Sequence, residues 1–290
     1  MERATARVLQ DGRLHLAHGP IDTLVSVDPV ASRAAAFEAA TVRFQSILTE
    51  LVAELPQLRT EGGANDALVG KVAQQMAAAV RPFQAAGVFV TPMAAVAGAV
   101  AYEVLAAILA APSPAPARVM VNNGGDIAIH LGEGERAKAR IASPSGETLG
   151  LVDLRAGDGV GGIATSGRHG RSLSLGIADS VTILAKTAAV ADAAATLVAN
   201  AVDLPGHQAV TRVDAETLDP DSDLRGRVVT TAVGQLSEAE VGAALDAGAT
   251  AAEAMRGAGL LAAALFLKGR WRTVGLPGII GAPAAILEGS

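Results

Sequence analysis

The chain contains no cysteine among its 290 residues. This absence excludes disulfides, thiolate catalysis and the zinc or iron–sulfur sites that cysteine ligands build. Aromatic residues are scarce, at 2% of the sequence, and positive charge is not in excess, because 23 Lys and Arg stand against 29 Asp and Glu. A nucleic acid partner is therefore not expected, since phosphates attract a positive surface and single-stranded bases stack on aromatic rings.

The sequence also lacks a long apolar run that is free of charge. The stretch 92–111 is about as long as a membrane span, but it contains Glu103 and has neither basic flanks nor an aromatic belt. We expect a buried core helix there. The N-terminus carries neither the apolar region nor the cleavage site of a secretory signal, so we expect a cytoplasmic protein with no membrane association.

The pattern of apolar residues predicts strands first and helices next. Alternation on either side of Asp11-Gly12 predicts a hairpin, and the run 24–27 predicts a third strand. Asp28-Pro29 then predicts the start of a helix, with Asp28 as its cap and Pro29 in its first position. Helical spacing of apolar residues predicts helices as far as Pro56, over 65–83 and over 92–111.

After the proline-rich run 112–116 the chain changes to short β-rich segments with two further helices. Strands are predicted at 118–121, 126–131, 138–142, 149–154, 181–184, 209–213, 228–232, 260–267 and 271–274, and helices at about 187–202 and 238–256. Helices and strands in separate blocks indicate an α+β fold, with a helical N-terminal half packed with a mixed or antiparallel sheet. We expect one domain over 1–290, with 112–116 as the place of any internal division.

Three segments of the second half carry residues suited to chemistry, and the first reads Asn122-Asn123-Gly124-Gly125-Asp126. Two glycines after a strand allow backbone N–H groups to converge on one anion. The adjacent Asp126 could hold a ribose hydroxyl or orient water on a metal. An ordinary hairpin turn explains the same residues equally well, because Asn-Gly and Gly-Asp are common turn sequences.

The second segment is the glycine-rich stretch 157–171. It contains G-x-G-x-x-G, but no helix pattern follows, so a dinucleotide-binding Rossmann site is rejected. Its last part brings together two hydroxyls, a glycine, an imidazole and two guanidinium groups, which are Thr165, Ser166, Gly167, His169, Arg168 and Arg171. Hydroxyls and arginine forks suit phosphate oxygens. A solvated basic loop is the alternative interpretation.

The third segment is the apolar helix predicted at 187–202. Asp192, Thr196 and Asn200 follow one another at intervals of four residues, so they form one polar stripe on the helix. A carboxylate and a hydroxyl are the hard oxygen ligands that Mg²⁺ prefers. Alternatively, Asp192 serves the N-terminus of the helix and the hydroxyl of Thr196 bonds back to a carbonyl group.

Taken in order, these segments resemble the ApbE family, the FAD:protein FMN transferases. Members carry a Gly-Gly-Asp turn, a Thr-Ser-Gly segment, a Ser-Val-Thr-Val strand and an Ala-Asp-Ala-x-Ala-Thr motif. The matching residues here are Gly124-Gly125-Asp126, Thr165-Ser166-Gly167, Ser180-Val181-Thr182-Ile183 and the run from Ala191 to Thr196. The stretches HGPIDTLVSVD and NNGGDIAI resemble more closely a group of uncharacterised ApbE-related proteins, and that resemblance covers essentially the whole chain.

The resemblance implies an ApbE-like α+β fold that binds FAD with its pyrophosphate near Mg²⁺. It implies that Asp192 and Thr196 ligate the metal through their side chains, and that a backbone carbonyl at Val96-Ala97-Gly98 completes the site. A redox protein would be the acceptor of the flavin group. Candidate catalytic residues are Asp126 and His169, and candidate nucleotide-binding residues are Asn123, Gly124, Gly125, Thr165, Ser166, Gly167, Arg168 and Arg171.

Two departures from the transferases bear on activity. Ala97 occupies the place of the family's lysine, and the short segment from Leu173 to Asp179 replaces a longer His-x-x-Asp-Pro-x-Thr-Gly stretch. The leading hypothesis is a Mg²⁺-assisted flavin-nucleotide protein, with transfer of FMN from FAD as its candidate reaction. Two alternatives stay open: a non-catalytic module that binds or delivers flavin, and a different enzyme that uses the same cleft, for instance in a catabolic pathway.

Overall fold

The computed structural model describes residues 3–62, 67–112, 114–142, 146, 148–170, 172–275 and 280–281. The chain forms two compact units. Unit 1 comprises Met1–Arg136, Arg155–Ala164 and Ala185–Ala193, and unit 2 comprises Ala137–Leu154, Thr165–Leu184 and Ala194–Ser290. The run 112–116 lies inside the first range of unit 1.

Unit 1 contains an antiparallel run of strands in the order β1-β2-β3-β4-β5-β8. Their bounds are Thr5–Val8 (β1), Leu14–His18 (β2), Ile21–Asp28 (β3), Arg118–Asn123 (β4), Asp126–Leu131 (β5) and Gly162–Ser166 (β8). The predicted hairpin around Asp11-Gly12 is confirmed, because Val8 of β1 lies opposite Leu14 of β2. Strand β3 alternates buried with more exposed residues, as expected of a sheet with one face on the core.

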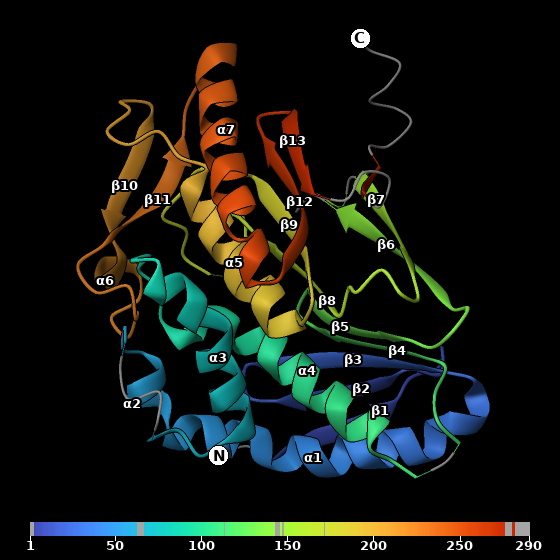
Figure 1. The fold of residues 1–290 in the computed structure, drawn as a ribbon. Coiled ribbons are helices and arrows are strands. Elements are labelled where there is room, and N and C mark those ends of the chain that lie inside the picture. The colour runs from blue at the N-terminus through green and yellow to red at the C-terminus, as the bar shows by residue number, and fades with distance from the viewer. Residues whose placement is uncertain are drawn as a thin grey trace. The chain divides into compact units, whose positions relative to one another are not determined.

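The helices of unit 1 follow and interrupt these strands. They are α1 (Arg33–Ala53), α2 (Leu55–Leu58), α3 (Lys71–Ala85) and α4 (Val96–Leu109), with 3₁₀ turns at Val30–Ser32 and Pro92–Ala95. Helix α4 packs against α1, α3, β4 and β5 (Figure 1), and most of its residues are small and apolar, which permits this contact on several sides. Helix α4 therefore belongs to the core of unit 1.

The helix at Pro92–Leu109 is long and apolar enough to cross a membrane, and 56% of this stretch is buried inside the protein. A core helix of a soluble protein meets the same test. Glu103, the charged residue in this helix, is only 5% exposed. It accepts hydrogen bonds from Arg43 of α1 (2.7 Å) and Gln75 of α3 (2.8 Å), so its charge is compensated by neighbouring helices.

Two predicted helix starts differ from the structure in detail. A 3₁₀ turn begins at Val30 with Pro29 in the N-cap position and leads directly into α1 at Arg33. The predicted cap role of Asp28 is wrong, because its carboxylate accepts hydrogen bonds from Arg33 (3.3 Å) and Arg118 (2.6 Å). Helix α3 begins at Lys71, later than the predicted 65. The carboxylate of Glu54 binds the backbone N–H groups of Val69 and Gly70 before α3 starts, and residues 65 and 66 lie outside the described residues.

Unit 2 contains the end of β8, the strands β9, β12 and β13, the pair β10-β11 and the three strands β14-β7-β6. Their bounds are Arg136–Ala142 (β6), Thr148–Arg155 (β7), Ser180–Ala185 (β9), Val210–Asp214 (β10), Val228–Val233 (β11), Leu260–Leu267 (β12), Arg270–Gly275 (β13) and Ile280–Gly281 (β14). Its helices are α6 (Ala215–Leu218) and α7 (Glu238–Ala254), and α7 packs against β12 and β13 (Figure 1). Helix α5 (Ala188–Ala201) begins in unit 1 and ends in unit 2.

The predicted α+β class is confirmed, with helices and mainly antiparallel strands in separate blocks of the chain. Strand β8 was not predicted, because glycines precede and begin it and hide its apolar pattern.

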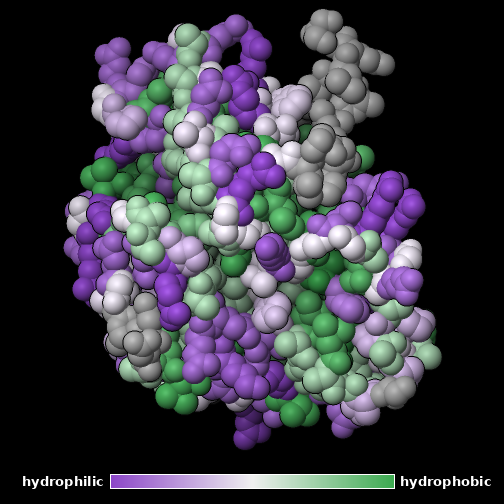
Figure 2. Space-filling view, viewed as in Figure 1, coloured by the Kyte–Doolittle hydropathy of each residue, from purple (hydrophilic) through white to green (hydrophobic). Residues whose placement is uncertain are grey.

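On the face in Figure 2, hydrophobic residues lie singly or in small groups among hydrophilic ones, which is normal for a folded protein surface.

Candidate functional site

The Asn122–Asp126 segment forms the tight turn between β4 and β5. Gly124 and Gly125 have φ angles of 66° and 114°, which only glycine adopts readily and which suit a two-residue hairpin. The N–H of Gly125 donates to the side-chain oxygen of Asn122 at 2.8 Å, and Asn123 lies opposite Asp126 in the ladder. The backbone is thus that of an ordinary hairpin, and one N–H of the predicted anion nest is bound within the turn.

Asp192 lies at the N-terminus of another helix. Its Oδ2 accepts a hydrogen bond of 2.9 Å from the N–H of Gly98, which lies in the first turn of α4, where N–H groups lack partners within the helix. Asp192 therefore serves a helix N-terminus, but the helix is α4 and not its own helix α5. The same contact brings Asp192 beside Val96-Ala97-Gly98, the segment expected to complete a metal site.

Glycines allow the backbone to approach the start of α5 closely within unit 1. A Cβ atom on Gly98 would lie 2.2 Å from the carbonyl oxygen of Ala188 and 2.9 Å from the Cβ of Asp192. A Cβ on Gly161 would lie 2.3 Å from the carbonyl oxygen of Lys186, and one on Gly162 would lie 2.3 Å from the Cα of Ala188. Because any side chain would overlap backbone atoms here, glycine is required for α4 and β8 to contact this part of α5.

The electrostatic surroundings of Asp192 favour positive charge. Burial of its carboxyl group raises the pKa of Asp192 well above the usual range, and the nearby carboxylate of Asp126 raises it further. Hydrogen bonds from the backbone N–H groups of Gly98 and Ala97 act in the opposite direction and lower this pKa. Two neighbouring carboxylates in a partly buried setting can share a proton or hold a cation.

The three residues of the predicted polar stripe on α5 have different surroundings. Asn200 accepts a hydrogen bond of 3.0 Å from the N–H of Leu175, so it holds a loop. Thr196 is half-buried, and within the part of the chain that the structure describes its hydroxyl makes no hydrogen bond. The alternative in which Thr196 bonds back to a carbonyl group is therefore not observed.

Unit 2 contains the predicted phosphate-binding segment, which forms the end of β8 and the following turn. The hydroxyls of Thr165 and Thr182 lie 2.9 Å apart and share a hydrogen bond. Gly167 has a φ of 149°, and a Cβ on it would lie 2.7 Å from the carbonyl oxygen of Asp179. The turn therefore packs directly against the residue that precedes β9, and Arg171 lies outside the described residues.

Asp179 organises this turn, and sequence reasoning missed it. Its Oδ1 accepts two hydrogen bonds from Arg168, at 2.9 and 2.7 Å, and its Oδ2 accepts one from the N–H of Lys268 at 2.6 Å. Nε2 of His169 lies 3.5 Å from Oδ1, and the His169 side chain is 41% exposed. A sequence signal existed, because an acidic residue directly precedes the Ser-Val-Thr strand and lies close to two arginines.

The segment that departs from the transferase pattern is held along its length in unit 2. The N–H of Ile177 donates to the carbonyl of Val202 at 2.8 Å, and the N–H of Asp179 donates to the carbonyl of Phe266 at 2.9 Å. A Cβ on Gly176 would lie 2.2 Å from the carbonyl oxygen of Ala199. These contacts fix the segment against α5 and β12.

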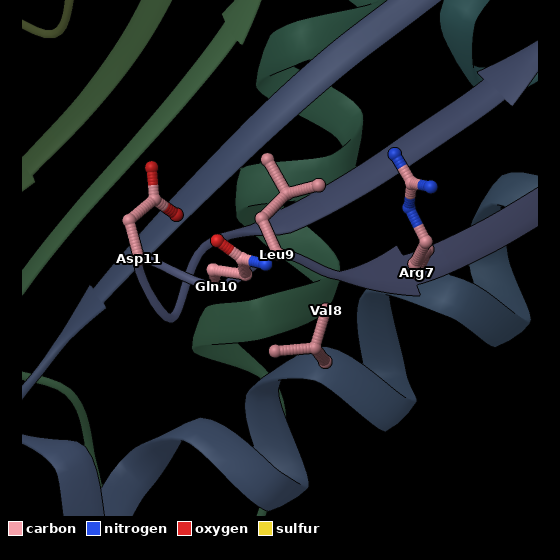
Figure 3. A pocket seen from close by; sticks show the side chains of 5 residues that line it. All are labelled: Arg7, Val8, Leu9, Gln10 and Asp11. Carbon is pink, nitrogen blue, oxygen red and sulfur yellow. The ribbon is translucent and has the colours of Figure 1, made fainter.

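Among the described residues, His, Asp and Glu side chains do not gather in groups of three or more that could hold a metal ion. A pocket in unit 1 lies at the edge strand β1 and its turn, and Arg7, Val8, Leu9, Gln10 and Asp11 line it. Figure 3 shows these side chains pointing in different directions, and Asp11 forms an ion pair with Arg13. The pocket contains none of the predicted site residues.

The chain is similar to curated proteins that are named UPF0280 proteins. A UPF0280 protein of Methanopyrus kandleri is 38% identical over 156 residues, which cover 52% of this chain and 54% of the relative. A UPF0280 protein of Methanothrix thermoacetophila is 39% identical over 113 residues, covering 39% of this chain and 46% of the relative. The chain thus spans about half the length of the curated relatives it matches.

Solved structures with a similar course of the chain are flavin transferases. The apo form of the flavinyl transferase ApbE from Pseudomonas stutzeri is 13% identical and has a TM-score of 0.40, over 94% of this chain and 95% of that one. The flavin transferase ApbE from Vibrio cholerae is 11% identical with a TM-score of 0.37, over 95% and 97%. Likeness at this level carries no functional argument.

Family membership rests on a different comparison. The model of the family described as "AbpE bacteria" matches residues 6–273, nearly the whole chain. The match includes the Gly-Gly-Asp turn, the Thr-Ser-Gly segment and the motif around Asp192 in the predicted order. The predicted resemblance is confirmed, and the chain belongs to this family.

Proposed function

We propose that this chain binds a flavin nucleotide, FAD, with the help of a divalent cation, Mg²⁺, at Asp192. The observation that carries the proposal is the position of the Asp192 carboxylate, whose Oδ2 accepts the N–H of Gly98 in the first turn of α4, with a second carboxylate, that of Asp126, in its surroundings. Neighbouring carboxylates repel one another, and a cation between or beside them removes that repulsion. Membership of the AbpE family supports flavin as the ligand.

The residues present suit Mg²⁺. Asp192 offers a carboxylate, and Thr196 follows one helical turn later on α5 with a hydroxyl that is free of hydrogen bonds to described residues. The carbonyl oxygen of Ala97 lies in the first turn of α4, where it accepts a hydrogen bond from Asn123, and it is proposed as a further oxygen ligand. Mg²⁺ prefers such oxygen ligands and completes its shell with water and substrate phosphates.

Most of the other predicted residues then have a role in the proposal. When bound, Mg²⁺ supplies positive charge that neutralises the diphosphate of the nucleotide. Asp126 orients the attacking hydroxyl of an acceptor, and Gly124 and Gly125 bring backbone N–H groups toward phosphate oxygens. In unit 2, phosphate contacts are proposed for Thr165, Ser166, Gly167, Arg168 and Arg171, and a catalytic role for His169.

The candidate reaction is transfer of FMN from FAD to a hydroxyl of a redox protein. The acceptor oxygen forms a bond to the FMN phosphorus, the bond between that phosphorus and the AMP oxygen breaks, and AMP leaves with the electron pair. The hydroxyl proton passes to a base, for which Asp126 and His169 are the candidates.

A non-catalytic flavin-binding module is the second candidate, and two contacts favour it. The guanidinium of Arg168 already donates two hydrogen bonds to Asp179, so only its remaining N–H groups can bind phosphate. The segment that replaces the transferase His-x-x-Asp-Pro-x-Thr-Gly stretch is fixed by contacts such as that between Ile177 and Val202.

The test compares three proteins: the wild type, Asp192→Asn and Asp221→Asn. Asp221 is an exposed loop residue, so its variant removes the same charge away from the site. Each protein is mixed with FAD, Mg²⁺ and a candidate acceptor, and AMP release and retained flavin are measured. We expect Asp192→Asn to reduce Mg²⁺-dependent AMP release at least about 100-fold, while Asp221→Asn matches the wild type.

The other outcomes separate the candidates. Retention of FAD without AMP release, lost in Asp192→Asn, favours the non-catalytic module. Absence of both FAD binding and Mg²⁺ binding in the wild type refutes the proposal.

A further inference from the structure

One peptide group at the start of α4 is held from both sides by side chains. Its carbonyl, that of Ala97, accepts a hydrogen bond of 3.1 Å from Nδ2 of Asn123. Its N–H, that of Gly98, donates a hydrogen bond of 2.9 Å to Oδ2 of Asp192. The peptide plane between Ala97 and Gly98 therefore links Asn123 on β4 to Asp192 on α5, and all four residues belong to unit 1.

The surroundings of Asn123 show that its side-chain N–H group is bound within the protein. Asn123 is only 5% exposed, although it is one residue from an exposed hairpin turn. Its neighbour Asn122 has the other orientation along the strand, and its side-chain oxygen accepts the N–H of Gly125. Two adjacent asparagines thus have separate tasks: Asn122 closes the turn, and Asn123 binds the α4 peptide.

Asn123 also connects the two carboxylates of the candidate site. It lies opposite Asp126 in the β4–β5 ladder, and through the Ala97–Gly98 peptide it contacts the group that binds Asp192. Rotation of this peptide would move the carbonyl of Ala97 and, at the same time, break the hydrogen bond between the N–H of Gly98 and Asp192. Close packing of Gly98 against Ala188 limits such rotation from the α5 side, and Asn123 limits it from the β4 side.

We infer that Asn123 is a positioning residue for the cation at Asp192, an inference that rests on the proposed function. It holds the carbonyl oxygen of Ala97 and the carboxylate of Asp192 in one fixed arrangement, without binding the cation or the nucleotide itself. Mg²⁺ demands near-ideal ligand geometry, and loss of a residue that orients metal ligands typically weakens metal affinity 10–100-fold.

The experiment uses Asn123→Leu, which has a similar volume and no N–H donor, and Asn122→Leu as the matched control. Mg²⁺ alone is titrated into each 290-residue protein by calorimetry. We expect the Mg²⁺ dissociation constant to rise about 10–100-fold for Asn123→Leu and to stay within about 3-fold of the wild type for Asn122→Leu. If the leucine variant does not fold, Asn123→Ala removes the same donor with less bulk.

A second readout does not depend on the metal. Hydrogen exchange of the Gly98 amide is measured by NMR without Mg²⁺, and we expect faster exchange in Asn123→Leu but not in Asn122→Leu. Unchanged Mg²⁺ affinity in Asn123→Leu, in a protein whose wild type binds Mg²⁺, overturns the inference and leaves the proposed function standing. Unchanged exchange of Gly98 also overturns it, and a wild type that does not bind Mg²⁺ overturns both.

Discussion

Replacing Gly98 with alanine should destabilise the protein, although alanine is the better helix former. The added Cβ would lie 2.2 Å from the carbonyl oxygen of Ala188 and 2.9 Å from the Cβ of Asp192. The carbonyl oxygen of Ala188 belongs to the backbone and cannot rotate away from the new Cβ atom, so the start of α5 must move away from α4. Overpacking of this kind typically costs about 1–3 kcal/mol, and the higher helix propensity of alanine offsets at most about 1 kcal/mol of this cost.

Gly242→Ala is the matched control, because Gly242 lies within α7 and a Cβ atom added to it would have no heavy atom within 4 Å. There the substitution should stabilise the protein by about 0.5–1 kcal/mol. Urea unfolding measures both free energies of unfolding, and thermal unfolding should shift by roughly 2–4 °C per kcal/mol. Stabilisation of similar size in both variants would refute the close contact between Gly98 and Ala188.

Two further predictions concern stability alone. Glu103→Ala should cost about 1–3 kcal/mol by urea unfolding, because Arg43 and Gln75 each lose a partly buried hydrogen-bond acceptor while Arg43 keeps its ion pair with Glu50, and a cost below about 0.5 kcal/mol would contradict this. Glu240→Gln should lower the melting temperature at neutral pH but not in strong acid. Hydrogen bonds from the Ser237 backbone and the His207 side chain lower the pKa of Glu240 from 4.5 to about 2, so its stabilisation is full above pH 4.5 and is lost as pH falls toward 2. A difference that stays constant between pH 6 and pH 3 would show that the interpretation is wrong.

Elements with a clear apolar period could be predicted from the sequence with accurate bounds. Strands β5 and β12 begin and end at the predicted residues, and α5 differs by one residue at each end. Helix starts were less predictable where a charged side chain has a distant partner. Aspartate is a common helix cap, but the carboxylate of Asp28 binds Arg118, which is 90 residues away in the sequence. This distant partner determines the orientation of the Asp28 side chain.

The candidate site shows the same limit. The acids Asp126 and Asp192 could be selected by motif and spacing, but the contact of Asp192 with Gly98 joins residues 94 apart. Asp179 was missed for a similar reason, since its partners include a backbone N–H in the β12–β13 turn, 89 residues away. Spacing describes neighbours on one element, whereas these contacts depend on how separate elements pack.

The balance of charge at Asp192 is the strongest physical reason to look for a cation there. The N-terminus of α4 and the N–H groups of Ala97 and Gly98 stabilise a negative carboxylate and lower its pKa. Burial and the nearby Asp126 act against them, and the net shift of the pKa is upward. The helix end therefore compensates only part of the negative charge that the fold brings together, and a bound cation would stabilise both carboxylates in their ionised form.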